Sequence, residues 1–180
     1  MVKLIKDSIM NTIGKTITLF FLILLNGCKD EELTLQRIPY FGNELRTDGY
    51  YYHYDDTSYD GIYTLCFFLF RNGTRLTAGS FKNTNLDTVE KQMLDRYKWL
   101  NHKSGWSIFV ITDNIMEIEG WSTSVGGGLP VYKAYYYIEN DTTLRLFKSI
   151  NSDGMEFEKD AIYHFRHFSP KPDSTNNFIQ

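Results

Sequence analysis

No apolar run in this 180-residue chain is long enough to cross a bilayer. The most apolar run, residues 17–25, has nine residues, whereas a membrane-spanning helix needs about 20. Basic residues are also outnumbered, with 19 Lys and Arg against 22 Asp and Glu. Nucleic-acid affinity depends on Lys and Arg neutralising phosphates, so this balance argues against a nucleic-acid partner.

Patterns typical of catalysis and metal binding are missing as well. His164 and His167 are three residues apart, so on a strand they face opposite sides and cannot share a metal. The glycines at 126–128 lack the Lys-Ser/Thr that completes a phosphate-binding loop. Glu117 and Glu119 share one strand face, but that face alternates with an apolar one and is expected to meet water. The sequence therefore predicts no catalytic residues, no metal and no cofactor.

The two cysteines occupy very different surroundings. Cys66 lies in Leu65-Cys66-Phe67-Phe68, where an apolar neighbourhood favours a buried thiol that acts as a small hydrophobic residue. Cys28 ends Leu25-Asn26-Gly27-Cys28, directly after the apolar run. Only Cys66 is therefore predicted to be a core residue.

The N-terminal residues have the layout of a secretory signal, in which a basic start and a short apolar stretch precede a cut site. The Leu-x-Gly-Cys ending resembles the lipobox of bacterial lipoproteins. This resemblance implies a signal peptide over 1–27, cleavage before Cys28 and lipidation of its sulfur, which would attach the chain to a membrane. The start of translation stays open between Met1 and Met10.

Lys29, Asp30, Glu31 and Glu32 follow the cysteine. Dense charge resists packing, which predicts a solvated acidic tether over 28–43. The run also resembles the export signal that sends lipoproteins to the cell surface in one group of Gram-negative bacteria. That resemblance implies a lipid-anchored outer-membrane protein displayed at the cell surface, and a periplasm-facing position is the alternative.

Residues 44–180 are expected to form one all-β domain. The 13 Tyr and 13 Phe favour pleated surfaces, and Asn72-Gly73 is a strong hairpin signal. Short strands with tight connections predict a sandwich or an antiparallel barrel of about eight strands, whose closure would remove exposed edges. The expected strands cover 45–54, 62–70, 74–80, 105–111, 115–121, 131–139, 143–150, 155–159 and 161–168.

One segment has helical rather than strand periodicity. Apolar residues recur at helical spacing from Leu86 to Leu100, with charged residues elsewhere around the axis. Asp87 and Glu90 have the spacing of a capping box. We therefore predict one amphipathic helix over 87–101, laid across the sheet or over one barrel mouth.

The order of these elements resembles that of lipocalin-like, or calycin, lipoproteins. The resemblance lies in the Tyr-rich opening strand with its Asn-Gly hairpin, in 105–115, and in the closing segments 163–165 and 172–178. It implies a lipocalin-like β-barrel over residues 45–180. Such a barrel is filled by side chains or holds one small ligand.

Two tyrosine ladders are the best candidates for ligand binding. Tyrosines at period two present their rings on one strand face, and they are Tyr50, Tyr52, Tyr54, Tyr135 and Tyr137. Core packing and cross-strand pairing explain the same pattern. The functional interpretation is an aromatic pocket or platform for an apolar molecule or a sugar ring.

Three short motifs resemble an O-glycosylation sequon of exported proteins in the same bacterial group, and they centre on Thr88, Thr142 and Ser174. Helix capping and turn formation explain the same residues. These residues are therefore kept as candidate modification sites.

Together these features predict a non-catalytic, lipid-anchored protein. Its barrel would hold a small apolar or glycan ligand, or the protein would serve as an accessory subunit for a protein partner at the outer membrane. The alternative is a structural or interaction module whose barrel is filled by its own side chains. A ligand binder should have a cavity of a few hundred Å³, and an interaction module an exposed aromatic patch.

Overall fold

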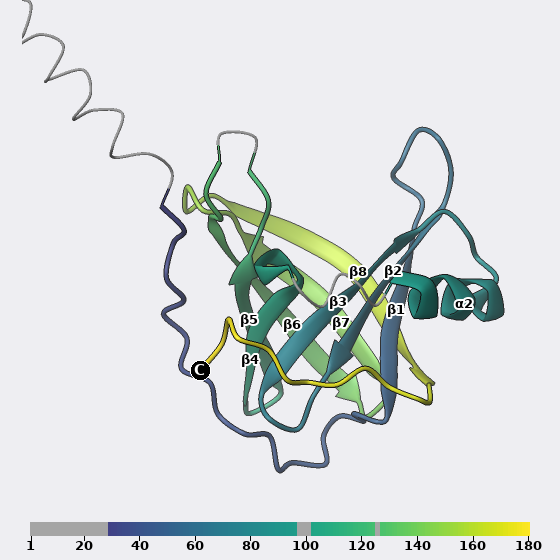
Figure 1. Cartoon of the computed structure of the whole chain (residues 1–180), viewed down its shortest axis with the longest axis horizontal. Helices are drawn as coiled ribbons and strands as arrows, with labels where there is room; N and C mark the ends of the chain where they lie inside the picture. The colour runs from purple at the N-terminus through teal and green to yellow at the C-terminus, as the bar shows by residue number, and fades with distance from the viewer. Residues whose placement is uncertain (1–28, 97–101, 125–126) are drawn as a thin grey trace, which may run out of the picture.

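A computed structural model describes residues 29–96, 102–124 and 127–180. They form a closed antiparallel barrel in which each strand pairs with the next and the last pairs with the first (Figure 1). The strands are β1 (Gly49–Asp55), β2 (Tyr63–Leu69), β3 (Thr74–Phe81), β4 (Trp106–Thr112), β5 (Ile115–Trp121), β6 (Val131–Asn140), β7 (Thr143–Ile150) and β8 (Glu156–His167). This architecture confirms the predicted all-β, eight-stranded barrel.

The prediction of two separate strands near the C-terminus was wrong. Residues 156–167 form one continuous strand, β8, which pairs with β7 and then with β1. Asp160, at the predicted break, lies on the solvent side and pairs with Arg145 of β7 at 2.9 Å. A charged residue on an outward face does not interrupt a strand, and this one is held by its cross-strand partner.

The barrel interior contains one of two apolar clusters. Directly paired residues point to the same side of a sheet, so the pair Tyr51 and Phe67 and the pair Phe109 and Ile118 both face inward. Rings of Tyr51 and Phe67 stack with centroids 5.6 Å apart. The buried interior residues are Leu45, Tyr51, Phe67, Leu69, Phe109, Met116, Ile118, Ala134, Tyr136, Ile138, Leu144 and Tyr163, with Tyr40 beside them.

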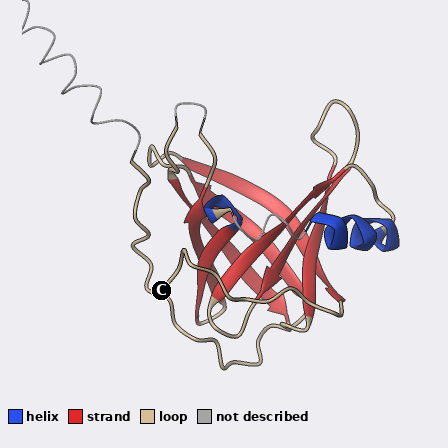
Figure 2. Ribbon diagram, in the orientation of Figure 1, coloured by secondary structure: helices blue, strands red, loops and turns tan. Residues whose placement is uncertain are grey.

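The second apolar cluster lies on the outside of the same wall. Alternate residues of β1 to β5 point outward, yet they are apolar and buried. Helix α2 (Leu86–Arg96) lies against the outer surface of the barrel and packs Val89 and Met93 on this cluster (Figure 2). The buried outer residues are Tyr50, Cys66, Phe68, Phe70, Leu76, Phe81, Val89, Met93, Trp106, Ile108, Trp121, Phe168 and Ile179.

The observed N-cap of the helix, Asn85, lies two residues before the predicted cap Asp87. Asn85 accepts a hydrogen bond from the Thr88 backbone N–H through its side chain at 3.0 Å, as an N-cap residue does. Asp87 instead pairs with Arg166 of β8, and Glu90 accepts a hydrogen bond from Arg166 at 2.7 Å. The helix is thus tied to β8 through its first two turns, and the predicted remainder, 97–101, lies outside the described residues.

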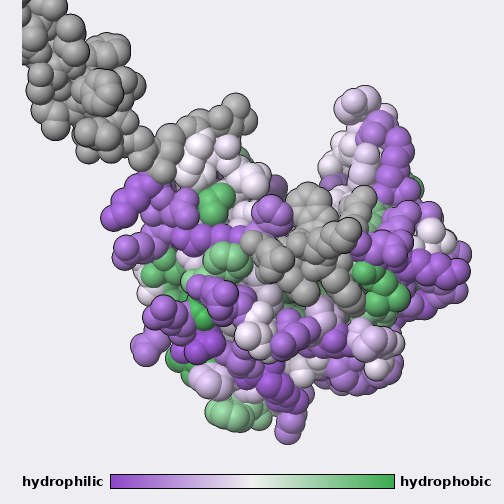
Figure 3. All heavy atoms as spheres, viewed as in Figure 1, coloured by the Kyte–Doolittle hydropathy of each residue, from purple (hydrophilic) through white to green (hydrophobic). Residues whose placement is uncertain are grey.

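Two chain ends complete the outer cover. The N-terminal segment 29–48 runs down beside β5 and passes under the barrel, and the C-terminal tail, residues 168–180, crosses the outside to end beside it (Figure 1). Lys171 in the tail donates to the carbonyls of Thr47 and Leu69. In the space-filling view hydrophilic residues dominate this face and hydrophobic ones form small separate areas (Figure 3). The chain ends therefore cover apolar surface that the barrel alone would expose.

The two ends of the barrel differ. The closed end carries the connections at 70–73, 113–114 and 141–142, and residues 40–48 lie across it. There Tyr51 donates from its hydroxyl to the carbonyls of Arg46 and Asp141, at 3.2 and 3.0 Å. The open end carries the connections at 56–62, 82–105, 122–130 and 151–155.

Burial of Cys66 generates a first prediction. Its side chain is 3% exposed, and burial raises the pKa of the thiol above its ordinary value. In a protein of residues 28–180 carrying Cys28→Ser, we expect Cys66 to react with Ellman's reagent at least about 100-fold more slowly than in urea, because reaction needs the thiolate and local opening. Fast labelling of the folded chain would contradict this placement.

Candidate functional site

Arg75 is a buried cation inside the barrel. It pairs with Leu69 of β2 and Ser107 of β4, which place it on the inner face, and only 9% of its surface is exposed. Its Nη1 donates to three hydroxyls: Thr77 at 3.1 Å, Ser107 at 3.3 Å and Tyr132 at 3.1 Å. The guanidinium carbon lies 4.4 Å from the ring centroid of Phe67, a cation–π distance.

This guanidinium has no carboxylate partner in the part of the chain that the structure describes. Its buried Nε also has no hydrogen-bond partner there. The outward-facing Arg46, Arg145 and Arg166, by contrast, each pair with a carboxylate. Because burying a charge without a counter-charge is costly, Arg75 is a candidate functional residue.

The hydroxyl groups around Arg75 accept hydrogen bonds from the guanidinium, but they are neutral and supply no counter-charge. Burial acts to lower the pKa of Arg75, while the nearby tyrosines 132, 136 and 163 act to raise it, and the net shift is upward. Burial raises the pKa of Tyr136 well above its ordinary value and also raises that of Tyr163. At neutral pH the interior therefore holds a permanent cation among uncharged phenols.

Space next to Arg75 opens toward solvent. Thr77, which accepts a hydrogen bond from Arg75, is exposed and lines a cavity of about 260 Å³ between β3 and residues 102–105. The cavity exists because β4 pairs only with residues 74–76 of β3 and leaves the rest of β3 diverging from it. The guanidinium is thus one hydrogen bond away from an accessible cavity at the open end.

A glycine makes room for the hydroxyl groups that surround Arg75. Gly120 of β5 pairs with Ser107 on one side and with Tyr132 on the other, so all three face inward. A Cβ at Gly120 would lie 2.5 Å from Ser107 Oγ, closer than real atoms approach. The missing side chain therefore lets the Ser107 hydroxyl reach both Arg75 and Tyr132.

The first predicted tyrosine ladder lies on the outer wall of β1. Tyr50 is fully buried in the outer cluster, and its hydroxyl donates to Glu90 of α2 at 3.1 Å. Tyr54 donates to the Thr84 carbonyl, and the rings of Tyr52 and Tyr54 pack edge to face at 5.4 Å. These contacts supply packing and position α2, and none of the three rings lines the interior.

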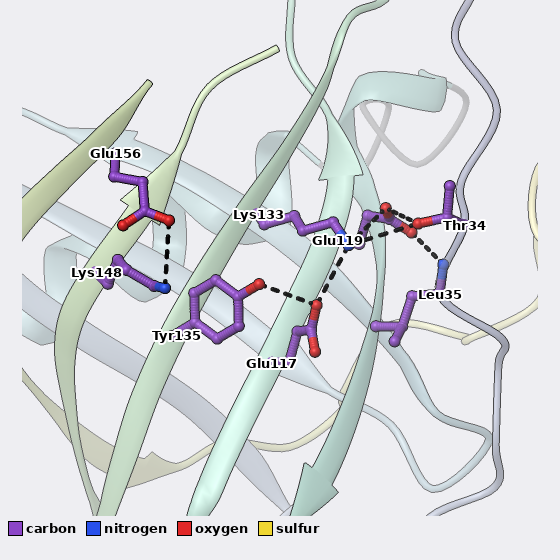
Figure 4. A network of polar contacts seen from close by, with 8 residues as sticks. All are labelled: Thr34, Leu35, Glu117, Glu119, Lys133, Tyr135, Lys148 and Glu156. Carbon is purple, nitrogen blue, oxygen red and sulfur yellow. Dashed lines mark hydrogen bonds and ion pairs between the residues drawn. The ribbon is translucent and has the colours of Figure 1, made fainter. Parts of the chain in front are cut away.

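The second ladder lies on the outer wall of β6. Tyr137 is 45% exposed and stacks on Phe147 with centroids 4.1 Å apart. Tyr135 donates to Glu117 at 3.2 Å and lies under the ammonium of Lys148 (Figure 4). The structure therefore does not bring the two ladders together in one pocket, and their ligand-binding role stays a prediction.

The predicted export signal contacts the barrel from Asp30 onward. Asp30 forms an ion pair with Lys103 at 2.9 Å, and the Glu31 carbonyl accepts from the Trp121 indole at 2.7 Å. The Glu31 carboxylate also accepts from the Val131 backbone N–H at 2.7 Å. Residues 29–35, which we call the strap, are thus attached to the open end. The export role of Lys29 to Glu32 stays a prediction, and Cys28 lies outside the described residues.

The strap also buries Glu119, which was expected to meet water. Glu119 is 1% exposed, and its carboxylate accepts from the Thr34 hydroxyl at 2.7 Å and from the Leu35 backbone N–H (Figure 4). Lys133 lies between Glu119 at 3.4 Å and Glu117 at 3.5 Å. The strand pattern was read correctly, but a distant segment covers this part of the outer face.

The three glycosylation candidates occupy local structure of their own. Thr88 lies in the first turn of α2, and Thr142 lies in the turn between β6 and β7, where its hydroxyl donates to Asn140. Ser174 is in the tail, and its carbonyl accepts from the Asn176 side chain. Capping and turn contacts thus involve all three, and their modification stays a prediction.

Two other kinds of feature are missing from the described residues. No three His, Cys, Asp or Glu side chains converge there in a way that could hold a metal ion. No helix in those ranges is long and apolar enough to cross a membrane.

Sequence reasoning missed Arg75 because β2, its neighbour in the hairpin, is apolar on both faces. Residues 65–70 give no alternation from which the inward face of β3 could be read. The available signal was the Asn72-Gly73 turn, which fixes the register of β2 against β3. Following that register would have placed Arg75 opposite Leu69, one residue pair beyond the turn.

Comparison with protein-family models, with curated proteins and with solved structures gives no match for this chain. The closed eight-stranded barrel is compatible with the lipocalin-like fold that the sequence resembles. The functional interpretation is therefore built on the geometry of this chain.

Attachment of the strap generates a second prediction. Glu119→Ala removes a buried charged acceptor of two hydrogen bonds, and we expect it to lower the free energy of unfolding by roughly 2–3 kcal/mol. Glu117→Ala, which removes a half-exposed carboxylate beside the same lysine, should cost less than about 1 kcal/mol. Urea titration of a protein of residues 28–180 measures both losses of free energy, and equal losses would show that the strap contributes little stability.

Proposed function

We propose that this protein is a non-catalytic binding protein, anchored to the outer membrane through Cys28, whose barrel holds a small molecule. The supporting observation is the cavity of about 260 Å³ between β3 and residues 102–105, which the inward-facing Thr77 helps to line. Its volume is slightly below the roughly 300 Å³ at which typical small-molecule sites begin, and the adjoining interior combines aromatic rings with a few hydroxyls, as such sites do.

A neutral fluorescent probe, N-phenyl-1-naphthylamine, tests whether the interior binds a small molecule. Ala161 faces inward beside Leu146, so Ala161→Phe would fill part of the interior. Ile162, the next residue, points outward and is 39% exposed, which makes Ile162→Phe a matched control. We expect saturable binding to the wild type, at least about 10-fold weaker binding to Ala161→Phe, and a change below about 2-fold in the control.

Absence of saturable binding, or equal loss in both variants, would overturn binding in the interior. Circular dichroism and urea titration of the two variants check that each keeps the fold of the wild type.

Membrane attachment is tested separately at Cys28. In bacteria that process lipoproteins, we expect the full chain to fractionate with membranes and to need detergent for release. The Cys28→Ser variant, which lacks the sulfur that would carry lipid, should appear in the soluble fraction. If Cys28→Ser chain stays with the membranes, anchoring through this residue is wrong. Protease treatment of intact cells then separates surface display from a periplasm-facing position.

An interaction module is the second candidate, because an aromatic patch is exposed on the outer wall. Tyr137 stacks there on Phe147, and Phe147 lines a second cavity of about 340 Å³ together with Ile115, Glu117, Tyr135 and Lys148. An exposed patch of this kind is typical of protein or ligand contact. Loss of a partner on Tyr137→Ser, with the naphthylamine probe still bound, would favour this function over the first.

A further inference from the structure

We infer that Arg75 binds the carboxylate of a monoanionic organic acid with an apolar body, which reaches it through the cavity beside Thr77. The inference rests on the proposed function, because it assigns a ligand class to the same interior. It depends on three properties of the site: an unmatched charge, hydroxyls with protons to donate, and apolar walls beside an opening.

The unmatched charge selects an anion. Arg75 is the one cation among the buried residues that the structure describes, and no carboxylate pairs with it there. One positive charge matches a single negative charge, whereas a phosphate dianion would leave an excess charge buried. Guanidinium groups also match the flat geometry of carboxylates.

Hydroxyls around Arg75 can complete the anion site. Thr77, Ser107 and Tyr132 each accept a hydrogen bond from Nη1, and each hydroxyl still carries a proton that it can donate. Ser107 and Tyr132 share one of these protons across 3.3 Å. The Thr77 proton and one proton of the pair remain for an acceptor, and a carboxylate is an acceptor without protons of its own.

The walls beyond the guanidinium favour an apolar body on the acid. Phe67 packs on Arg75, and the rings of Tyr136 and Tyr163 lie within 6.1 Å of the Phe67 ring, centroid to centroid. On the other side, Thr77 reaches the cavity at the open end, which provides the entry. An acid entering there would meet the cation beside these rings.

Displacement of the neutral naphthylamine probe tests the inference with acid and alcohol pairs of equal carbon skeleton. The panel contains linear acids of eight to twelve carbons and phenylalkanoic acids, each beside its alcohol. We expect the preferred acids to displace the probe from the wild type at concentrations at least about 10-fold lower than their alcohols. Preference for linear or for aromatic acids distinguishes lipid-derived ligands from aromatic metabolites.

Arg75→Gln should reduce the advantage of acid over alcohol to less than about 2-fold while the alcohols displace the probe as before. Arg145→Gln, which removes an outward arginine of the barrel wall, is the matched control and should keep the full advantage. If circular dichroism shows that Arg75→Gln does not fold, the comparison of acids with their alcohols on the wild type decides whether the barrel has a carboxylate site.

The outcomes separate the two proposals. If the wild type binds the probe but no acid in the panel displaces it better than its alcohol, the carboxylate site is wrong and interior binding stands. If the advantage persists in Arg75→Gln, the acid binds elsewhere and the assignment to Arg75 is overturned. If the wild type does not bind the probe, both proposals fall.

Discussion

The structure depends on a barrel wall that is apolar on both faces. Strand β2 shows the constraint most clearly, because Phe67 and Leu69 point inward while Cys66 and Phe68 point outward, and all four are buried. A wall of this kind cannot stand alone in water, so segments outside the barrel must cover it. Helix α2, the N-terminal segment and the C-terminal tail supply this cover, and their charged anchors, such as Arg166 with Glu90, fix where each lies.

The interior contains an apolar core and a small polar group beside it. In the core, aromatic and aliphatic side chains pack closely. Around Arg75 the packing changes to hydroxyls, a glycine and a cavity. A core selected for stability alone would gain by placing an apolar side chain at position 75. The buried charge of Arg75 is therefore the physical basis of the proposed acid site, whereas the proposal of a binding protein rests on the cavity beside Thr77.

Local patterns predicted the barrel well, and contacts between distant segments explain the failures. The Asn72-Gly73 turn and the alternation in β5 marked strand limits that the structure reproduces. Glu119 was assigned to water because nothing in residues 115–121 reveals that Thr34 and Leu35 cover it. Arg75 was missed for a related reason, since the inner side of β3 is defined by β2 and β2 has no polar side. Whether a single polar residue is buried depends on the assembled fold, and the residues next to it in the sequence carry little information about it.

Attachment of the strap has a consequence for how the protein would move on its membrane. Asp30 forms an ion pair with Lys103, so a lipidated Cys28 would be separated from the attached strap by one residue, Lys29, which allows at most about 7 Å between the Cα atoms of Cys28 and Asp30. A tether this short would restrict the barrel to positions close to the bilayer surface. The open end, where the strap is attached, would stay within molecular contact of the lipid headgroups. An acid leaving the bilayer could then enter the barrel without diffusing through bulk water, and exchange would become a two-dimensional process.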